Sequence, residues 1–389
     1  MSEATTSPDL LFQDEIRAAV RDAYRVLPAG AGRTVTDRFY DRDELDGLPA
    51  PALDWALGVG NPVAHAALQR GEVVLDLGCG GGIDTLLAAR GVGPTGRVSG
   101  LDTVPEMCER AEQSIRDAGL DDCCEVHVGD MEAIPLPDDG IDVVISNGVL
   151  NLSPRKSRAI AEMARVLRPG GRLCITDLVV ERQLPPAVLA SEAAWAGCIA
   201  GAVSEQVLRR KLERRGFADV TIEHGTPFSV DDVAAYPLFP ADVIELMHRL
   251  LPEDEHDQVA TGVVIRAART EATPPPAELD AGGSGVVRLA DVAPSSVEAP
   301  GVTVRPLKQV EDVHLKVLDV EPGGATPFHT HAHAHEGVVM TGRGALRLAD
   351  GRRPLTPGDA FTVAPNALHA IEADDDEPLR FACMDCFVE

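Results

Sequence analysis

The residues best placed to do chemistry in this 389-residue chain are glycines and acids that follow two apolar runs. Gly78 and Gly80 come after the run at 73–77, and Asp102 ends the next run. Glycines allow close backbone approach to a ligand, and a carboxylate at a strand end can accept hydrogen bonds from both ribose hydroxyls. The arrangement predicts a nucleoside cofactor at the carboxyl edge of a parallel sheet.

The spacing distinguishes between two cofactors. A dinucleotide site requires G-x-G-x-x-G, but Ile83 occupies the third glycine position. Asp76, before the first glycine, would repel a phosphate and favour a ligand that carries a cationic or amino group. The sequence therefore favours S-adenosylmethionine over NAD. The expected cofactor contacts are Asp76, Gly78, Cys79, Gly80, Asp102, Thr103, Asp130, Met131 and Asn147.

A second set of candidate ligands lies near the C-terminus. His329 and His331 alternate, so they share one face of a strand, and His369 follows on a later strand. Three imidazoles suffice for a divalent first-row metal (Fe, Mn, Zn or Ni) with open coordination positions. The segment therefore predicts a metal site.

Alternating strand and helix patterns over residues 73–180 must position the glycines and acids. This alternation predicts a doubly wound, Rossmann-like α/β domain with a parallel sheet and helices on both faces. A helix is expected at 12–26, a helical pair at 191–202 and 204–216, and a completing strand at 262–269.

The composition changes after this α/β region. We assign residues 1–270 to the first domain and the Pro-, Gly- and Ala-rich stretch 271–285 to a linker. Residues 286–389 contain short strand patterns broken by turns, which predict an all-β barrel or jelly roll.

Charge and hydropathy limit the partners. The net charge is −27, and the four lysines (156, 211, 308 and 316) form no basic stripe, which argues against nucleic acid. The N-terminus lacks a signal-peptide pattern and no apolar run reaches the length of a membrane span, so we expect a cytoplasmic protein without membrane association.

Residues 15–270 resemble the class I S-adenosylmethionine-dependent methyltransferases, and among them the arsenite methyltransferase group. The resemblance rests on LGVGNPVAHA (57–66), VGPTGRVSGLDTVPEM (92–107), ISNGVLNLSPRK (145–156), ARVLRPGGRLCITDLV (164–179) and AWAGCIAGA (194–202). It implies the Rossmann-like fold, the cofactor and methyl transfer.

The cysteines depart from the family pattern. Family members bind trivalent arsenic with several thiolates, but this chain has Val59 and Gly148 at two of those cysteine positions, and only Cys198 matches. We therefore expect a small-molecule acceptor, with Cys198 as a candidate substrate contact. Turnover of arsenite or another soft element, with external thiols completing the ligands, is the alternative.

An oxygen, nitrogen or carbon acceptor would be helped by a general base. The candidates near the expected site are Tyr40, His65, Asp177 and Glu192.

Residues 286–389 resemble the cupin family. The resemblance rests on Gly323, the H-x-H at 329–331, Gly342, Gly358 and Pro365. It implies a fourth metal ligand from either His335 or Glu336, with His335 slightly favoured. The domain could bind or process the same substrate, or act as a non-catalytic sensor or a dimerisation module; a homodimer through the cupin is one expectation.

Overall fold

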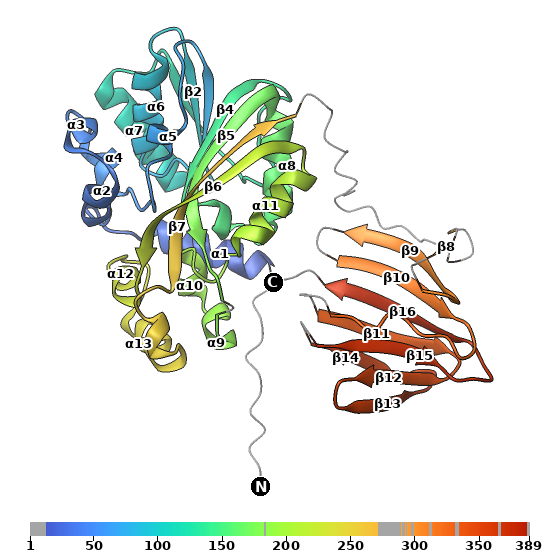
Figure 1. Cartoon of the computed structure of the whole chain (residues 1–389). Coiled ribbons are helices and arrows are strands. Elements are labelled where there is room, and N and C mark those ends of the chain that lie inside the picture. The colour runs from blue at the N-terminus through green and yellow to red at the C-terminus, as the bar shows by residue number, and fades with distance from the viewer. Residues whose placement is uncertain are drawn as a thin grey trace. The chain divides into compact units, whose positions relative to one another are not determined.

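The computed structural model describes residues 13–182, 184–270, 289, 292, 294–296, 299–310, 313–330, 334–364 and 367–386. The chain divides into two compact units, residues 1–277 and 278–389 (Figure 1). The predicted linker at 271–285 lies outside the described residues. None of the described helices is long and apolar enough to cross a membrane.

The first unit is built on a seven-stranded sheet in the order β3-β2-β1-β4-β5-β7-β6. Its strands are β1 (Val73–Leu77), β2 (Arg97–Asp102), β3 (Cys124–Val128), β4 (Ile141–Asn147), β5 (Leu167–Val179), β6 (Phe217–Phe228) and β7 (Ala260–Arg269). Strands β1 to β5 pair in parallel, as predicted. The sheet is not parallel throughout, because β7 enters between β5 and β6 and pairs antiparallel with both.

Helices cover both faces of this sheet (Figure 1). The alternation along β1 explains why: Val74 packs with α6 on one face, whereas Leu75 packs with α8 and α11 on the other. The longer helices are α1 (Gln13–Arg25), α2 (Arg33–Phe39), α6 (Ile83–Val92), α7 (Pro105–Ala118), α8 (Lys156–Val166), α11 (Glu205–Arg214) and α13 (Ala241–Leu250). The shorter ones are α3 (Arg42–Leu45), α4 (Ala50–Asp54), α5 (Pro62–His65), η1 (Leu150–Leu152), α9 (Pro186–Leu189), α10 (Glu192–Ala196), α12 (Val230–Ala234) and η2 (Glu253–Glu255).

The helix expected at 191–202 is much shorter than predicted. It is α10, which ends at Ala196, and Cys198 then adopts a left-handed φ of +66°. Gly197 supports this break, because a Cβ there would lie 2.0 Å from the Phe239 ring. Cys198 is therefore a loop residue rather than a helical one.

The second unit is an all-β sandwich, as predicted. Its sheets have the orders β14-β11-β16-β10-β9-β8 and β13-β12-β15, and the described pairings within them are antiparallel. Leu346, Phe361 and Phe381 are among the residues of its core. The strands are β8 (Ser295–Ser296), β9 (Val302–Val310), β10 (Val313–Val320), β11 (Ala334–Thr341), β12 (Gly344–Leu348), β13 (Gly351–Leu355), β14 (Ala360–Val363), β15 (His369–Ala373) and β16 (Leu379–Cys386).

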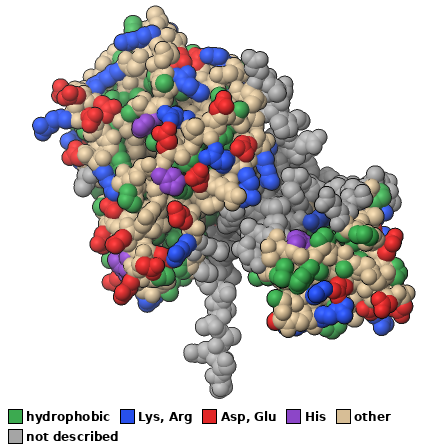
Figure 2. Space-filling model, viewed as in Figure 1, with side chains coloured by type: hydrophobic (Ala, Val, Ile, Leu, Met, Phe, Trp, Pro, Cys, Tyr) green, Lys and Arg blue, Asp and Glu red, His purple; other side chains and the backbone are tan. Residues whose placement is uncertain are grey.

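Charged side chains of both signs lie on the face drawn in Figure 2. Acidic and basic groups are interspersed over the face of the molecule drawn in Figure 2 rather than gathered by sign.

Candidate functional site

A pocket opens at the carboxyl ends of β1, β2 and β4, where the sequence predicts the cofactor. Its lining includes every predicted cofactor contact except Asp76: Gly78, Cys79, Gly80, Asp102, Thr103, Asp130, Met131 and Asn147. These residues come from four separate strand ends. The parallel order of β3-β2-β1-β4 brings them to one edge.

The glycine turn is held against the end of β2 by hydrogen bonds. The Gly78 and Cys79 N–H groups donate to the Leu101 carbonyl at 2.7 and 3.0 Å, and the Gly80 N–H donates to Asp102 Oδ2 at 3.0 Å. Gly78 has a φ of +80°, and a Cβ there would lie 2.3 Å from Val149. The turn therefore requires glycine, for backbone conformation and for space.

Asp76 lies behind the pocket and not in its lining. It is 2% exposed and accepts a 2.6 Å hydrogen bond from the Thr85 hydroxyl. Asp84, in the first turn of α6, does line the pocket. Sequence reasoning missed Asp84; its signal was an acid at the start of the helix that follows the glycine turn.

Burial changes the protonation of both carboxyls. Desolvation, with the neighbouring Asp84 charge, raises the pKa of Asp76 to about 8. Desolvation raises the pKa of Asp84 to about 6, although hydrogen bonds from Asn147 and Tyr40 oppose this. The pair therefore holds a proton at neutral pH in the ligand-free protein.

These raised pKa values predict a pH-dependent stability. A carboxyl that is protonated when folded but ionised when unfolded stabilises the fold most below about pH 4, and this contribution is lost as pH rises toward the folded pKa. We expect the free energy of unfolding to lose about 1.4 kcal/mol per pH unit for each such carboxyl up to its folded pKa, which is about 6 for Asp84 and about 8 for Asp76. Urea denaturation between pH 5 and 8 measures this; Asp76→Asn should flatten the decline, whereas Asp117→Asn, on the exposed part of α7, should leave it unchanged. Parallel curves for Asp76→Asn and the native protein would contradict the assignment.

Asn147 connects the pocket to the loop that contains Val59. Its Oδ1 accepts hydrogen bonds from the N–H groups of Val59 and Gly60 at 2.9 and 3.2 Å, and from the Thr176 hydroxyl. Its Nδ2 donates to Asp84 Oδ2 at 3.0 Å. Asn147 therefore shapes the site as well as lining it.

Helix α1 supplies one wall of the pocket. Arg17, Val20 and Tyr24 share a face of this helix and all line the pocket. Arg17 is the only cation among the lining residues, and it pairs with Glu132, which also pairs with Arg155 at 2.7 Å. The sequence indicated the helix, but not that the face with Arg17, Val20 and Tyr24 would meet the pocket.

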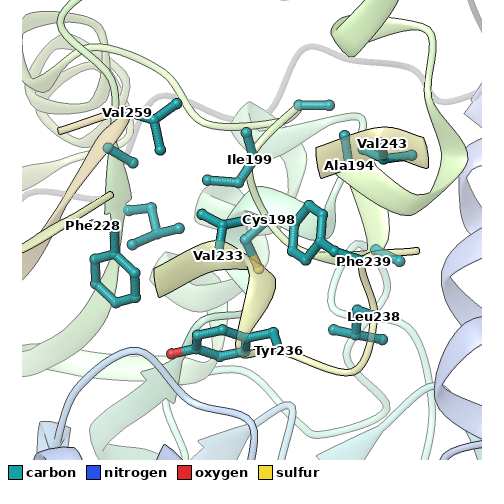
Figure 3. Packing of buried hydrophobic residues seen from close by; sticks show 14 of the residues in the cluster. Ala194, Cys198, Ile199, Phe228, Val233, Tyr236, Leu238, Phe239, Val243 and Val259 are labelled. Atoms are coloured by element: carbon teal, nitrogen blue, oxygen red, sulfur yellow. The ribbon is translucent and has the colours of Figure 1, made fainter. Parts of the chain in front are cut away.

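The three positions at which the resemblance implied thiolates converge in the fold. The Cys198 thiol donates to the Gly148 carbonyl at 2.9 Å, and a Cβ on Gly148 would lie 3.6 Å from the Val59 methyl groups. Cys198 is 4% exposed and is absent from the lining of the pocket. Figure 3 shows its sulfur among Val233, Tyr236 and Phe239. Burial raises the pKa of the Cys198 thiol well above its usual value.

The four candidate bases lie in different environments. Tyr40 and Asp177 are buried and engaged: Tyr40 donates to Asp84 at 2.9 Å, and Asp177 accepts hydrogen bonds from Asn151. Burial raises the pKa of Asp177 to about 6. His65 and Glu192 are exposed. None of the four is among the residues that line the pocket.

The histidines of the second unit are described only in part. His329 and His369 form an antiparallel bridge, with ring centroids 4.8 Å apart. His369 is 1% exposed. His331 and the side chain of His335 lie outside the described residues, and Glu336 is exposed on β11. Among the described residues no group of three or more His, Cys, Asp or Glu could hold a metal.

Comparison with known families assigns both units. Residues 68–216 match the methyltransferase domain model, and residues 316–385 match the cupin domain model. The chain joins a methyltransferase domain to a cupin domain. This confirms both predicted resemblances and the two fold classes.

Curated relatives include arsenite methyltransferases. The chain is 42% identical to that of Halobacterium salinarum over 183 residues, which are 47% of this chain and 46% of the relative. It is 32% identical to that of Aquipseudomonas alcaligenes over 179 residues, 43% of this chain and 50% of the relative. The chain thus spans about half the length of these relatives.

Solved structures include an arsenic(III) S-adenosylmethionine methyltransferase from Chlamydomonas reinhardtii. It is 22% identical, with a TM-score of 0.43, over 92% of this chain and 96% of the other.

Proposed function

We propose that the chain is an S-adenosylmethionine-dependent methyltransferase that acts on a small-molecule acceptor and carries a metal-binding cupin. One observation carries the proposal: the glycine turn and Asp102 are joined by the Gly80 hydrogen bond inside a pocket that Asp84 and Asp130 also line. When bound, the sulfonium cofactor supplies an electrophilic methyl group. The carboxylates stabilise the positive charge of the cofactor. The glycine turn, which has no side chains at positions 78 and 80, lets the cofactor approach the protein backbone closely.

The remaining wall of the pocket favours an organic acceptor. Tyr24, Trp55, Leu57, Val149 and Leu152 present aromatic and aliphatic surface to it. Such a wall orients an acceptor and excludes water, so that catalysis is mainly positioning and desolvation.

Arsenite or another soft element is the alternative acceptor, as in the relatives. A soft ion is best held by convergent thiolates, and here two of the three convergent positions lack sulfur. Under this alternative Cys198 and two external thiols would hold the ion.

The test is cofactor turnover by the purified full chain with glutathione, with and without arsenite, and with products identified by mass spectrometry. We expect S-adenosylmethionine to bind and arsenite not to increase the release of S-adenosylhomocysteine. Methylated arsenic that disappears with Cys198→Ser would establish the alternative. Failure to bind the cofactor at all would overturn the methyltransferase proposal.

The cupin histidines fit a metal ligand set. The Nδ1 atoms of His329 and His369 lie 2.6 and 2.9 Å from the carbonyls of Pro327 and Ala367. These carbonyls accept a hydrogen bond from the protonated Nδ1 and leave Nε2 as the basic nitrogen, and ligating histidines are commonly oriented by such a hydrogen bond. With His331 and either His335 or Glu336 they would hold Fe, Mn, Zn or Ni; the exposure of Glu336 favours His335.

The cupin would bind or process the acceptor, since fusion raises the effective concentration for successive steps. A non-catalytic sensor remains the alternative role. Leu315, Val338 and Met340 are large apolar side chains that stay 38–48% exposed on the six-stranded sheet, which supports a homodimer through this domain. We place the protein in the cytoplasm, where buried thiols stay reduced, and propose no nucleic-acid or membrane partner.

A further inference from the structure

Two histidines of the first unit face each other outside the pocket. His248 lies in the last turn of α13, and His256 follows η2. Their Nδ1 atoms are 3.4 Å apart, and their rings are nearly perpendicular, with centroids separated by 4.8 Å. Neither residue has a role in the function proposed above.

The surroundings determine which nitrogens carry protons. His256 Nε2 lies 3.1 Å from the Leu251 carbonyl oxygen, which can only accept, so this nitrogen holds the proton. His248 Nε2 faces the Asp231 carboxylate at 3.7 Å, which favours the same tautomer. Both Nδ1 atoms then present lone pairs to each other, an arrangement that a cation bound between them would stabilise.

The separation suits a metal ion. Two Zn–N bonds of about 2.0–2.1 Å at a tetrahedral angle place their nitrogens about 3.3–3.4 Å apart. The carbonyl and carboxylate behind the two rings are the partners that orient ligating histidines. Nearby acids at 253–255 and 257 add negative charge.

We propose that His248 and His256 bind one divalent transition metal ion, with zinc as the probe, through their Nδ1 atoms. Water completes the coordination, because no third His, Cys, Asp or Glu joins the pair among the described residues. Imidazole ligands select zinc, copper or nickel over magnesium and calcium.

Such an ion would stabilise part of the hydrophobic cluster that surrounds Cys198. Met247, next to His248 in sequence, and Leu251, whose carbonyl accepts from His256, pack in the same cluster as Cys198. The His256 carbonyl accepts from the Val230 N–H at 2.9 Å, where α12 begins. Metal binding would therefore link α13 to the segment around His256, whose carbonyl is hydrogen-bonded to the start of α12; α12 and α13 are labelled in Figure 1.

Zinc stoichiometry of the full chain tests the proposal. After chelator treatment, equilibrium dialysis against zinc should give one equivalent less for His248→Gln/His256→Gln than for the native protein. The control, His65→Gln/His224→Gln, removes two exposed histidines of α5 and β6 and should keep the native value. Cupin-bound zinc contributes equally to all three proteins. Equal stoichiometry in the native protein and the His248/His256 variant would overturn the proposal.

Nitrogen NMR of the imidazoles gives an independent readout that does not depend on stoichiometry. Zinc should shift the Nδ1 resonances of His248 and His256 together, whereas magnesium at the same concentration should not. If the Nδ1 chemical shifts of His248 and His256 do not change when zinc is added, because the two rings share a proton instead, the proposal is also overturned. Matching melting temperatures of the metal-free native protein and variant would show that the substitutions leave the fold intact.

Discussion

Asp102→Asn is expected to weaken S-adenosylmethionine binding by about 100-fold. The two carboxylate oxygens accept from different backbone groups: Oδ2 from Gly80 and Oδ1 from Val104, at 3.0 and 2.9 Å. Asparagine would place an N–H donor against one of these N–H groups and would also lose the charge. Charge-assisted hydrogen bonds contribute about 1.5–3 kcal/mol each, and a hundredfold change is about 2.7 kcal/mol.

Isothermal titration calorimetry with S-adenosylmethionine measures this loss. Asp121→Asn, an exposed acid between α7 and β3, makes the same chemical change and should bind as the native protein does. Native affinity in Asp102→Asn, with a native melting temperature, would show that the cofactor does not lie against Asp102.

The double variant Val59→Cys/Gly148→Cys is expected to bind arsenite at least about 100-fold more tightly than the native protein. A Cβ at Gly148 would lie within ordinary contact of Val59, and the Gly148 carbonyl is 2.9 Å from the Cys198 sulfur. Three thiols would then converge, as a soft trivalent ion requires. Arsenite brings three hydroxides that leave as water with the thiol protons, so the raised pKa of Cys198 does not prevent binding.

Gly148 has a φ of +68°, so its replacement strains the backbone, and the variant should also unfold at a lower temperature. Arsenite affinity is measured by competition with a fluorescent dithiol-reactive arsenical. Adding Cys198→Ser to the double variant should return the affinity toward the native value. An unchanged affinity in the folded double variant would mean that the three positions do not form one site.

The shared location of the glycine turn and Asp102 was predictable because their signals are local. The glycine turn and the acid that ends β2 are sequence patterns with direct backbone consequences, and the structure brings them together. Asp76 shows the limit: the sequence places it beside the turn, but strand alternation and packing direct its side chain to Thr85. Asp84 takes the place in the lining that the sequence had assigned to Asp76.

Other outcomes depended on contacts between distant segments. Periodicity predicted a helix through Cys198, but the close approach of Phe239 to Gly197 favours a loop. Strand β7 runs antiparallel to both β5 and β6, and its position between these two strands is a contact between segments far apart in the sequence. Arg17 reaches Glu132, 115 residues away, and no local pattern indicates such a pair.

By itself the sequence determined the two fold classes, the pairing of the glycine turn with an acid at the end of the next strand, and the absence of cysteine at positions 59 and 148. Strand periodicity, turn glycines and residue identity are properties of short segments, so they can be recognised in a single sequence without knowledge of the tertiary contacts. Only the tertiary structure decided that Val59, Gly148 and Cys198 meet, that α1 walls the pocket, and that His248 faces His256. Those contacts form when buried apolar faces pack. Packing brings together residues that are far apart along the chain, and no local sequence pattern predicts which of them will meet.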